Sequence, residues 1–109
     1  FGRIVNIISV SVKAPIQNLG ISNTVRWAMA SWSKTLSFEL GKFGITVNNI
    51  LPGFIDSLPS KEEFLMRIPL KRYGKVSEVS AVVELLSSVG GGYITGQNIR
   101  VDGGITRSV

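Results

Sequence analysis

Hydrophobic positions along the chain form two short continuous runs separated by a longer segment with helical spacing. Residues 3–10 and 45–51 are rich in Ile and Val, a pattern typical of strands that are buried on both faces. Residues 21–42 repeat apolar side chains every three or four positions, which predicts a long helix between these strands. The order strand, helix, strand predicts a parallel βαβ unit, whose crossover is right-handed in nearly all known cases.

Polar residues and glycines mark the predicted ends of the long helix and of the second strand. Either Asn18 or Ser22 could cap the start of the helix, and Gly41 and Gly44 bracket its end. Pro52 and Gly53 end the second strand in a turn. The remaining elements that we predict are a short polar helix around residues 60–67, a helix from Ser77 closed by Gly90–Gly92, a strand at 98–102, and a turn at Asp102-Gly103-Gly104.

The long helix carries apolar side chains on two of its sides. One stripe consists of Val25, Met29, Trp32, Leu36, Leu40 and Phe43, and a second side carries Trp27, Ala30, Ser31 and Phe38. A helix that is apolar on two faces either lies deep inside a protein or packs against a partner on its outer side. Because a chain of 109 residues offers little depth, we predict an interface on the outer side.

The composition limits both the class of protein and its chemistry. With 109 residues, 44% of them hydrophobic, and no long apolar run, we expect one globular domain over residues 1–109 that does not span a membrane. The absence of cysteine excludes a disulfide framework and a thiolate metal site, and the absence of histidine removes the commonest general base and metal ligand. Acid–base chemistry must therefore come from Ser, Tyr, Lys, Asp or Glu, and we expect no metal.

The net charge of +5 is compatible with nucleic acid or with a phosphate-bearing cofactor in a basic cleft. Most of the lysines and arginines are scattered along the chain, with one local cluster at residues 67–75, and aromatic residues are not interleaved with them. Stacking platforms for single-stranded nucleic acid need such interleaving. We therefore expect a cofactor and no nucleic acid.

Three stretches of the sequence, in the same order and with matching gaps, resemble one known family. They are GRIVNIISVS at residues 2–11, SNTVRWAMASWSKTLSFELGKFGITVNNILPGFIDS at residues 22–57, and YITGQNIRVDGG at residues 93–104. Together they resemble the C-terminal half of a short-chain dehydrogenase/reductase, closest in style to the 3-oxoacyl-carrier-protein reductase branch. The resemblance implies an α/β fold: the C-terminal half of a doubly wound, parallel, Rossmann-like sheet, with about three strands.

The resemblance also sets expectations for the rest of the protein. In this family the corresponding long helix packs against its copy in a second subunit, so we expect a homo-oligomer formed through residues 21–42. The phosphate-binding turn of the family, Gly-x-x-x-Gly-x-Gly, lies near its N-terminus, so we expect it before Phe1 and regard the sequence as an interior cut. Gly90–Gly92 precede no helix start, so we interpret them as a linker. No signal or transit pattern is visible, and we expect a cytoplasmic protein.

Members of this family transfer a hydride between NAD or NADP and a small carbonyl or alcohol substrate. A serine polarises the substrate oxygen, a tyrosine acts as general acid/base, and a lysine four residues later holds the nicotinamide ribose and lowers the tyrosine pKa. The resemblance places Ser9 at the serine, Ser22 at the tyrosine and Arg26 at the lysine. The motif Ser-Asn-x-x-Arg therefore stands where Tyr-x-x-x-Lys is usual, as in a divergent group within the family.

These two replacements have different chemical consequences. A phenol near pKa 10 can be brought towards neutrality by an adjacent cation, whereas a serine hydroxyl such as that of Ser22 is far too weak an acid to protonate an alkoxide unaided. Arg26 can still donate hydrogen bonds to ribose hydroxyls and supply a fixed positive charge. The structural alternatives are that Ser22 simply caps the helix and that Arg26 is a solvent-facing cation.

A second group of residues resembles the cofactor loop of the family. Residues 52–57, Pro-Gly-Phe-Ile-Asp-Ser, resemble Pro-Gly-x-x-x-Thr, in which backbone groups near Ile55 meet the nicotinamide carboxamide and the hydroxyl at Ser57 reaches the cofactor. The expected cofactor-binding residues are therefore Arg26, Pro52, Gly53, Ile55 and Ser57. The alternative is a plain turn at the end of a strand. Residues 58–69 are shorter than the usual substrate lid, so the resemblance does not identify the substrate.

Two main hypotheses follow for the whole protein. The first is an NAD(P)-dependent oxidoreductase with a non-standard active site, in which the 109-residue segment alone would be inactive. The second is a catalytically inactive relative that binds only the cofactor or partner subunits, and the replacement of the tyrosine motivates it. A third hypothesis, a small nucleic-acid-binding module, rests on net charge alone.

Overall fold

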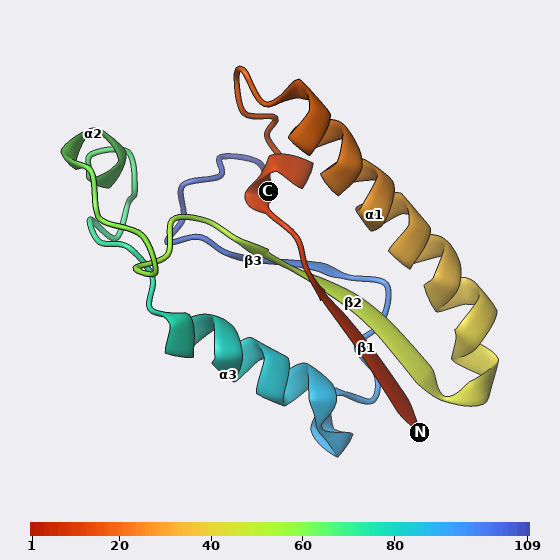
Figure 1. The fold of residues 1–109 in the computed structure, drawn as a ribbon. Coiled ribbons are helices and arrows are strands. Elements are labelled where there is room, and N and C mark those ends of the chain that lie inside the picture. Colours follow the sequence, from red (N-terminus) through yellow and green to blue (C-terminus); the bar gives the residue numbers. More distant parts are fainter.

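The computed structural model describes residues 1–109, and its three strands form a single parallel sheet (Figure 1). The strands are β1 (Gly2–Ile7), β2 (Ile45–Pro52) and β3 (Asn98–Val101), and β2 lies between the other two. Residues 46–51 of β2 are all buried. This continuous burial is expected of a central parallel strand covered on both faces, and it confirms the predicted α/β sheet.

The two main helices lie on opposite sides of the sheet (Figure 1). The long helix α1 (Gly20–Leu40) packs on β2, and α3 (Val76–Ser87) packs on β1 and β2. A short helix α2 (Glu62–Leu65) follows β2, and 3₁₀ turns lie at η1 (Val10–Val12), η2 (Gly41–Phe43) and η3 (Val89–Gly91). This doubly wound arrangement matches the prediction. None of the helices combines the length and the apolar character needed to cross a membrane.

Small side chains form the surface of α1 that meets the sheet. Its buried residues are Ala30, Ser33 and Ser37, and Ser33 Oγ accepts a hydrogen bond of 3.0 Å from Asn6 Nδ2 on β1. The apolar stripe predicted from Val25 to Phe43 is not the buried face, because Val25 and Trp32 are 59% and 52% exposed. Small residues let the helix backbone approach the sheet closely, so the bulky apolar residues are left on its flanks.

A row of asparagines crosses the sheet beneath α1. Asn6, Asn49 and Asn98 are in register on the three strands. Asn6 Nδ2 donates to Asn49 Oδ1 at 3.1 Å, and Asn49 Nδ2 donates to Asn98 Oδ1 at 2.8 Å. These bonds satisfy the buried amide of Asn49, and a slip of one residue would break the row. The row therefore fixes the register of the strands whose ends carry the candidate site.

The first strand ends at Ile7, three residues before the predicted end at residue 10. Ile8 N donates to Ile50 O at 2.8 Å, so the next bond of a parallel ladder would run from the nitrogen of residue 52 to Ile8 O. Residue 52 is proline, which has no N–H. The ladder therefore stops, and the chain turns into η1 with Ser9 as its N-cap.

The predicted caps of the long helix are wrong. The residue before the helix is Leu19, with no side-chain cap; Ser22 lies inside the first turn; and Asn18 has φ of 68°. Asn23 holds the entry instead: its Oδ1 accepts from Ile16 N at 3.3 Å, and its Nδ2 donates to Ile16 O at 2.8 Å. The two bonds tie the preceding loop to the helix without a capping side chain.

The other boundaries deviate by a few residues from the sequence prediction. The left-handed Gly44 closes the end of η2 after α1, as expected. Helix α3 begins at Val76 instead of Ser77, and α2 covers only Glu62–Leu65 of the predicted residues 60–67. The third strand ends at Val101, one residue early. Gly91 packs in η3, where an added Cβ would lie 2.6 Å from Leu85 O, so this glycine is required sterically.

Candidate active site

The candidate site lies at the carboxyl edge of the sheet. Because β1 and β2 are parallel, the segment after Ile7, with Ser9, and the segment after Pro52 leave the sheet at the same edge (Figure 1). Beneath this edge, Ile8, Val12, Ala30 and Leu51 form a buried apolar cluster between η1, α1 and β2. Ligands of open α/β sheets bind outside the carboxyl ends of their strands, so the fold itself directs attention here.

Arg26 supplies the hydrogen bond that Pro52 cannot. Its Nη1 donates to Ile8 O at 2.9 Å, and this oxygen is the one left without a ladder donor. The guanidinium is thereby fixed beside the Ile8–Ser9 peptide. Its remaining N–H groups have no acceptor in the protein, so they are available to a ligand. The alternative of a freely solvated Arg26 does not hold, because the side chain is half-buried and tethered.

Ser22 and Arg26 line the same hollow on α1, one helical turn apart. The hollow has a volume of about 680 Å³, and its lining is mostly apolar. We call it the α1 hollow; its lining residues are Ile7, Ile8, Ser22, Val25, Arg26, Ala28, Met29 and Trp32. Ser22 is half-buried, and its hydroxyl makes no hydrogen bond within the protein. The structure therefore brings together Ser22 and Arg26, the two residues expected at the tyrosine and lysine positions, and leaves the Ser22 hydroxyl free.

Ser9 lies next to the α1 hollow but does not line it. Its Oγ accepts a hydrogen bond of 3.1 Å from Ser11 N and so caps η1. The residue directly before it, Ile8, does line the hollow and carries the carbonyl that Arg26 holds. Ser9 Oγ accepts in this arrangement, so its proton remains available for donation to another group.

The loop Pro52–Ser57 is held in place by backbone hydrogen bonds on two sides. Gly53 N donates to Val101 O at 3.0 Å, and a Cβ at Gly53 would lie 2.9 Å from Asp102 Cα. Further along, Ile55 forms a parallel bridge with Gly74. The loop is therefore anchored to β3 at its start and to the segment before α3 in its middle.

The bridge at Ile55 leaves a donor unused. Its two bonds run from Asp56 N to Gly74 O at 2.8 Å and from Gly74 N to Phe54 O at 2.9 Å. The N–H of Ile55 itself has no acceptor in the protein, although the residue is partly buried, and the exposed Ser57 hydroxyl is also unpaired. An amide N–H, a hydroxyl and the free guanidinium N–H groups suit the carboxamide and ribose hydroxyls of a nicotinamide nucleotide.

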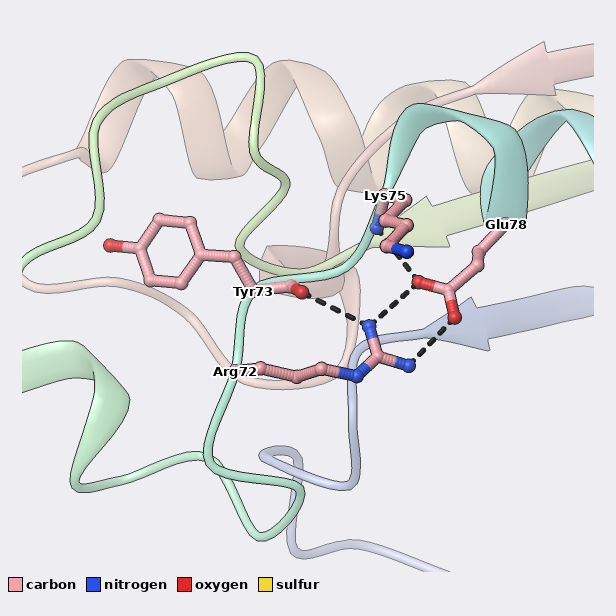
Figure 2. A network of polar contacts seen from close by, with 4 residues as sticks. All are labelled: Arg72, Tyr73, Lys75 and Glu78. Atoms are coloured by element: carbon pink, nitrogen blue, oxygen red, sulfur yellow. Dashed lines mark hydrogen bonds and ion pairs between the residues drawn. The ribbon is translucent and has the colours of Figure 1, made fainter.

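One exposed ion pair borders this loop (Figure 2). Arg72 Nη2 lies 2.7 Å from Glu78 Oε1. The hydrogen bond from Arg72, together with one from the Lys75 backbone N–H, lowers the pKa of Glu78 from 4.5 to about 2. Glu78 is therefore ionised at any pH at which an enzyme normally works. The structure contains no cluster of three or more His, Cys, Asp or Glu side chains that could hold a metal ion.

Comparison with known proteins agrees with this geometry. The family model described as "Enoyl-(Acyl carrier protein) reductase" matches residues 1–106 of the chain. The chain belongs to the short-chain dehydrogenase/reductase family. Among curated members of the family, the NADPH-dependent reductase BacG of Bacillus subtilis is 33% identical over 127 residues, covering 100% of this chain and 49% of that protein.

A further curated member and a solved structure match over the same part of the chain. The 3-oxoacyl-[acyl-carrier-protein] reductase FabG of Pseudomonas aeruginosa is 38% identical over 117 residues, covering 99% of this chain and 47% of that protein. The crystal structure of YwfH, an NADPH-dependent reductase involved in bacilysin biosynthesis, matches with a TM-score of 0.92 and 35% identity, over 100% of this chain and 48% of that one. The chain thus spans about half the length of the family members it matches.

The structure groups the residues predicted from the sequence into two sets. Ser22 and Arg26 share the α1 hollow, with Ser9 adjacent to it. Pro52, the last residue of β2, and Gly53, Ile55 and Ser57 on the loop after it do not line the hollow. Three other residues were missed: Asn23, Arg72 and Glu78. Glu78 accepts from the backbone N–H of Lys75 as the glutamate of a capping box does, but the sequence signal was weak, because a lysine stands at the N-cap where this motif usually has Ser or Thr.

Proposed function

We propose that the protein containing this chain is a cytoplasmic, NAD(P)-dependent oxidoreductase that reduces a small carbonyl compound or oxidises the corresponding alcohol. In this proposal residues 1–109 form the nicotinamide end of the site. The observation that carries the proposal is the position of the Arg26 guanidinium. It donates to Ile8 O at 2.9 Å next to Ser9, at the carboxyl ends of the strands, and its other N–H groups remain free to bind a ligand. The NADPH-dependent activities named for BacG and YwfH support it.

The cofactor contacts follow from the unused donors. Arg26 donates to the ribose hydroxyls, the N–H of Ile55 to the nicotinamide carboxamide, and Ser57 contributes its hydroxyl. Pro52 and Gly53 set the course of the loop, because the first ends the strand ladder and the second fits against Asp102. When bound, the nicotinamide group supplies or accepts the hydride.

Ser9 and Ser22 have different roles towards the substrate. Ser9 polarises the substrate oxygen through its free proton, while its Oγ remains the acceptor for Ser11 N. Ser22 orients the substrate by hydrogen bonding but does not act as the general acid, because no base activates it and the chain has no histidine. The lining of the α1 hollow contains no Tyr, Lys, Asp or Glu, so in this proposal the proton of the reaction comes from water.

The outer surface of α1 supports self-association. Ile21, Trp27 and Phe38 are exposed by 85%, 51% and 76%, an unusual density of apolar side chains for one helix in water. We propose that a second copy covers this surface. Trp27→Asp should reduce the sedimenting mass of the assembly, whereas Ala81→Asp on the exposed side of α3 should not. An unchanged mass for Trp27→Asp would contradict self-association through α1.

The main experiment separates cofactor binding from chemistry. The protein in its natural length is titrated with NADH and with NADPH while nicotinamide fluorescence is recorded, and turnover is then tested against a panel of ketones and aldehydes. We expect saturable binding of at least one nucleotide and turnover that falls on Ser9→Ala. Absence of binding to both nucleotides would refute the proposal. Binding without turnover of any substrate would instead favour a relative that only binds the cofactor.

A further inference from the structure

A small network ties the segment before α3 to the first turn of that helix (Figure 2). The Arg72 guanidinium binds both carboxylate oxygens of Glu78, at 2.7 and 2.9 Å, and Nη1 also donates to Tyr73 O at 3.1 Å. Glu78 Oε2 in turn accepts from Lys75 N at 2.7 Å. Residues 72–75 are therefore connected to Glu78 at three points, although both charged side chains lie at the surface.

Residues 72–75 also pack against the loop Pro52–Ser57 and hold it in place. Gly74 forms both bonds of the bridge with Ile55, and its Cα side is so close that an added Cβ would lie 3.0 Å from Ile55 Cδ1. The buried Tyr73 ring lies 5.4 Å from the ring of Phe54, and Phe54 stacks on Phe64 of α2 at 4.5 Å. Residues on both sides of Ile55 are thus held by residues 73 and 74.

We propose that Arg72 and Glu78 are positioning residues for the nicotinamide cofactor, acting through Gly74 on the N–H of Ile55. This inference rests on the proposed function. In this proposal neither side chain contacts the cofactor. The ion pair fixes the path of residues 72–75, the bridge transmits that path to residues 54–56, and the free N–H of Ile55 is thereby aimed away from Gly74.

The surface location of the pair distinguishes positioning from general stabilisation. The Arg72 and Glu78 side chains are 49% and 40% exposed. Exposed ion pairs contribute little to the overall stability of a protein. The structural effect of breaking this pair should therefore be local, in the order of the bridge, with little change in the melting temperature.

The test compares Glu78→Gln, Arg72→Lys and Arg72→Met with two matched controls. The controls are Glu84→Gln on α3 and Arg67→Lys, since both residues are exposed and make no side-chain hydrogen bond. Hydrogen exchange at the amides of Asp56 and Gly74 reports the bridge directly. In Arg72→Met we expect exchange at these amides to accelerate about tenfold, as for a local opening. The effect should be smaller in Arg72→Lys, because lysine keeps the positive charge but cannot form two parallel hydrogen bonds to the Glu78 carboxylate.

Cofactor affinity provides the second readout. We expect the dissociation constant for NADPH, or for NADH if that is the preferred nucleotide, to rise about three- to tenfold in Arg72→Met and Glu78→Gln, comparable to the partial loss of one hydrogen bond. The KM for the nucleotide should rise similarly, with kcat nearly unchanged. Both controls should bind as the wild type does.

Two results would overturn the inference. One is exchange at Asp56 and Gly74 equal to that of the controls, and the other is faster exchange with unaltered nucleotide affinity. If Arg72→Met unfolds, Arg72→Lys and Glu78→Gln decide the matter by the same readouts. A wild type that binds no nucleotide refutes the proposed function and the cofactor role together, whereas the exchange measurement still shows whether the pair holds the loop.

Discussion

Replacing Arg26 by methionine tests the link between the end of β1 and the candidate site. Methionine has a similar reach and keeps the apolar contacts in the α1 hollow, but it cannot donate a hydrogen bond to Ile8 O. In the wild type, Arg26 donates to this oxygen at 2.9 Å. No backbone donor can replace it, because the ladder partner is Pro52. The variant therefore leaves a partly buried carbonyl without a protein donor.

The size of the effect follows from the type of bond. A hydrogen bond from a charged donor contributes about 1.5–3 kcal/mol, and the half-buried position of Arg26 lets water replace part of it. We therefore expect the free energy of unfolding to fall by about 1–2 kcal/mol. For a protein that unfolds with a urea m-value of about 2 kcal/mol/M, the midpoint would shift down by about 0.5–1 M.

Urea unfolding can be followed by tryptophan fluorescence, since Trp27 and Trp32 both lie on α1 with Arg26. The matched control is Arg107→Met, because Arg107 is exposed and makes no side-chain hydrogen bond. The same Arg26→Met variant should also weaken nucleotide binding. If its midpoint falls no further than that of Arg107→Met, the argument that Arg26 completes the ladder at Ile8 is wrong.

Three other variants test separate parts of the structure. Ser22→Tyr combined with Arg26→Lys restores a phenol and an ammonium, and we expect ketone reduction to accelerate about a hundredfold or more, as measured by nucleotide consumption at saturating substrate; an unchanged rate would contradict the assigned positions. Gly53→Ala places a Cβ 2.9 Å from Asp102 Cα, so it should displace the loop and raise the nucleotide KM, and a KM equal to that of the wild type would contradict the steric argument. The pKa of Glu78 is lowered from 4.5 to about 2, so its contribution to stability is present above pH 4.5 and is lost as the pH falls towards 2, and solvent screening of the exposed pair keeps that contribution small. Glu78→Gln should slightly flatten the pH dependence of the unfolding free energy in that interval, and identical slopes would contradict the shift.

Much of the fold could be predicted because its signals are local. The run of apolar residues in β2 is continuous, and a strand buried on both faces requires this pattern. Gly44 ends the turn after α1 in a left-handed conformation that glycine adopts without strain. For these elements, the residues that determine the structure lie within the element itself or next to it.

The errors arose where a distant residue decides the structure. The end of β1 depends on Pro52, which is 45 residues beyond Ile7 in the sequence, although its nitrogen occupies the ladder position that would bond to Ile8 O. The buried face of α1 is set by how closely the helix approaches Asn6, which favours Ala30 and Ser33 over the larger apolar residues. A hydrophobic pattern taken from one segment contains neither piece of information.

The side of the sheet on which α3 lies could not be predicted from its own sequence either. The strand order β1-β2-β3 means that both crossovers step in the same direction across the sheet, yet α1 and α3 lie on opposite sides of it (Figure 1). The two connections therefore have opposite handedness, and the general rule for parallel crossovers predicts only one of them. This placement brings the first turn of α3, with Glu78, to the segment that supports the cofactor loop.

The two positions that we propose are replaced in this chain, Ser22 and Arg26, are chemically coupled. In the usual Tyr-x-x-x-Lys motif of the family the lysine has two tasks: it holds the ribose, and it lowers the pKa of the phenol. With Ser22 in the acid position there is no phenol whose pKa needs lowering, so the cation retains only the task of holding. Arginine performs that task with five N–H donors in a fixed plane, and one of them is already used on Ile8 O. The pair Ser22 and Arg26 is therefore consistent with a site that keeps the cofactor contact and takes its proton from water.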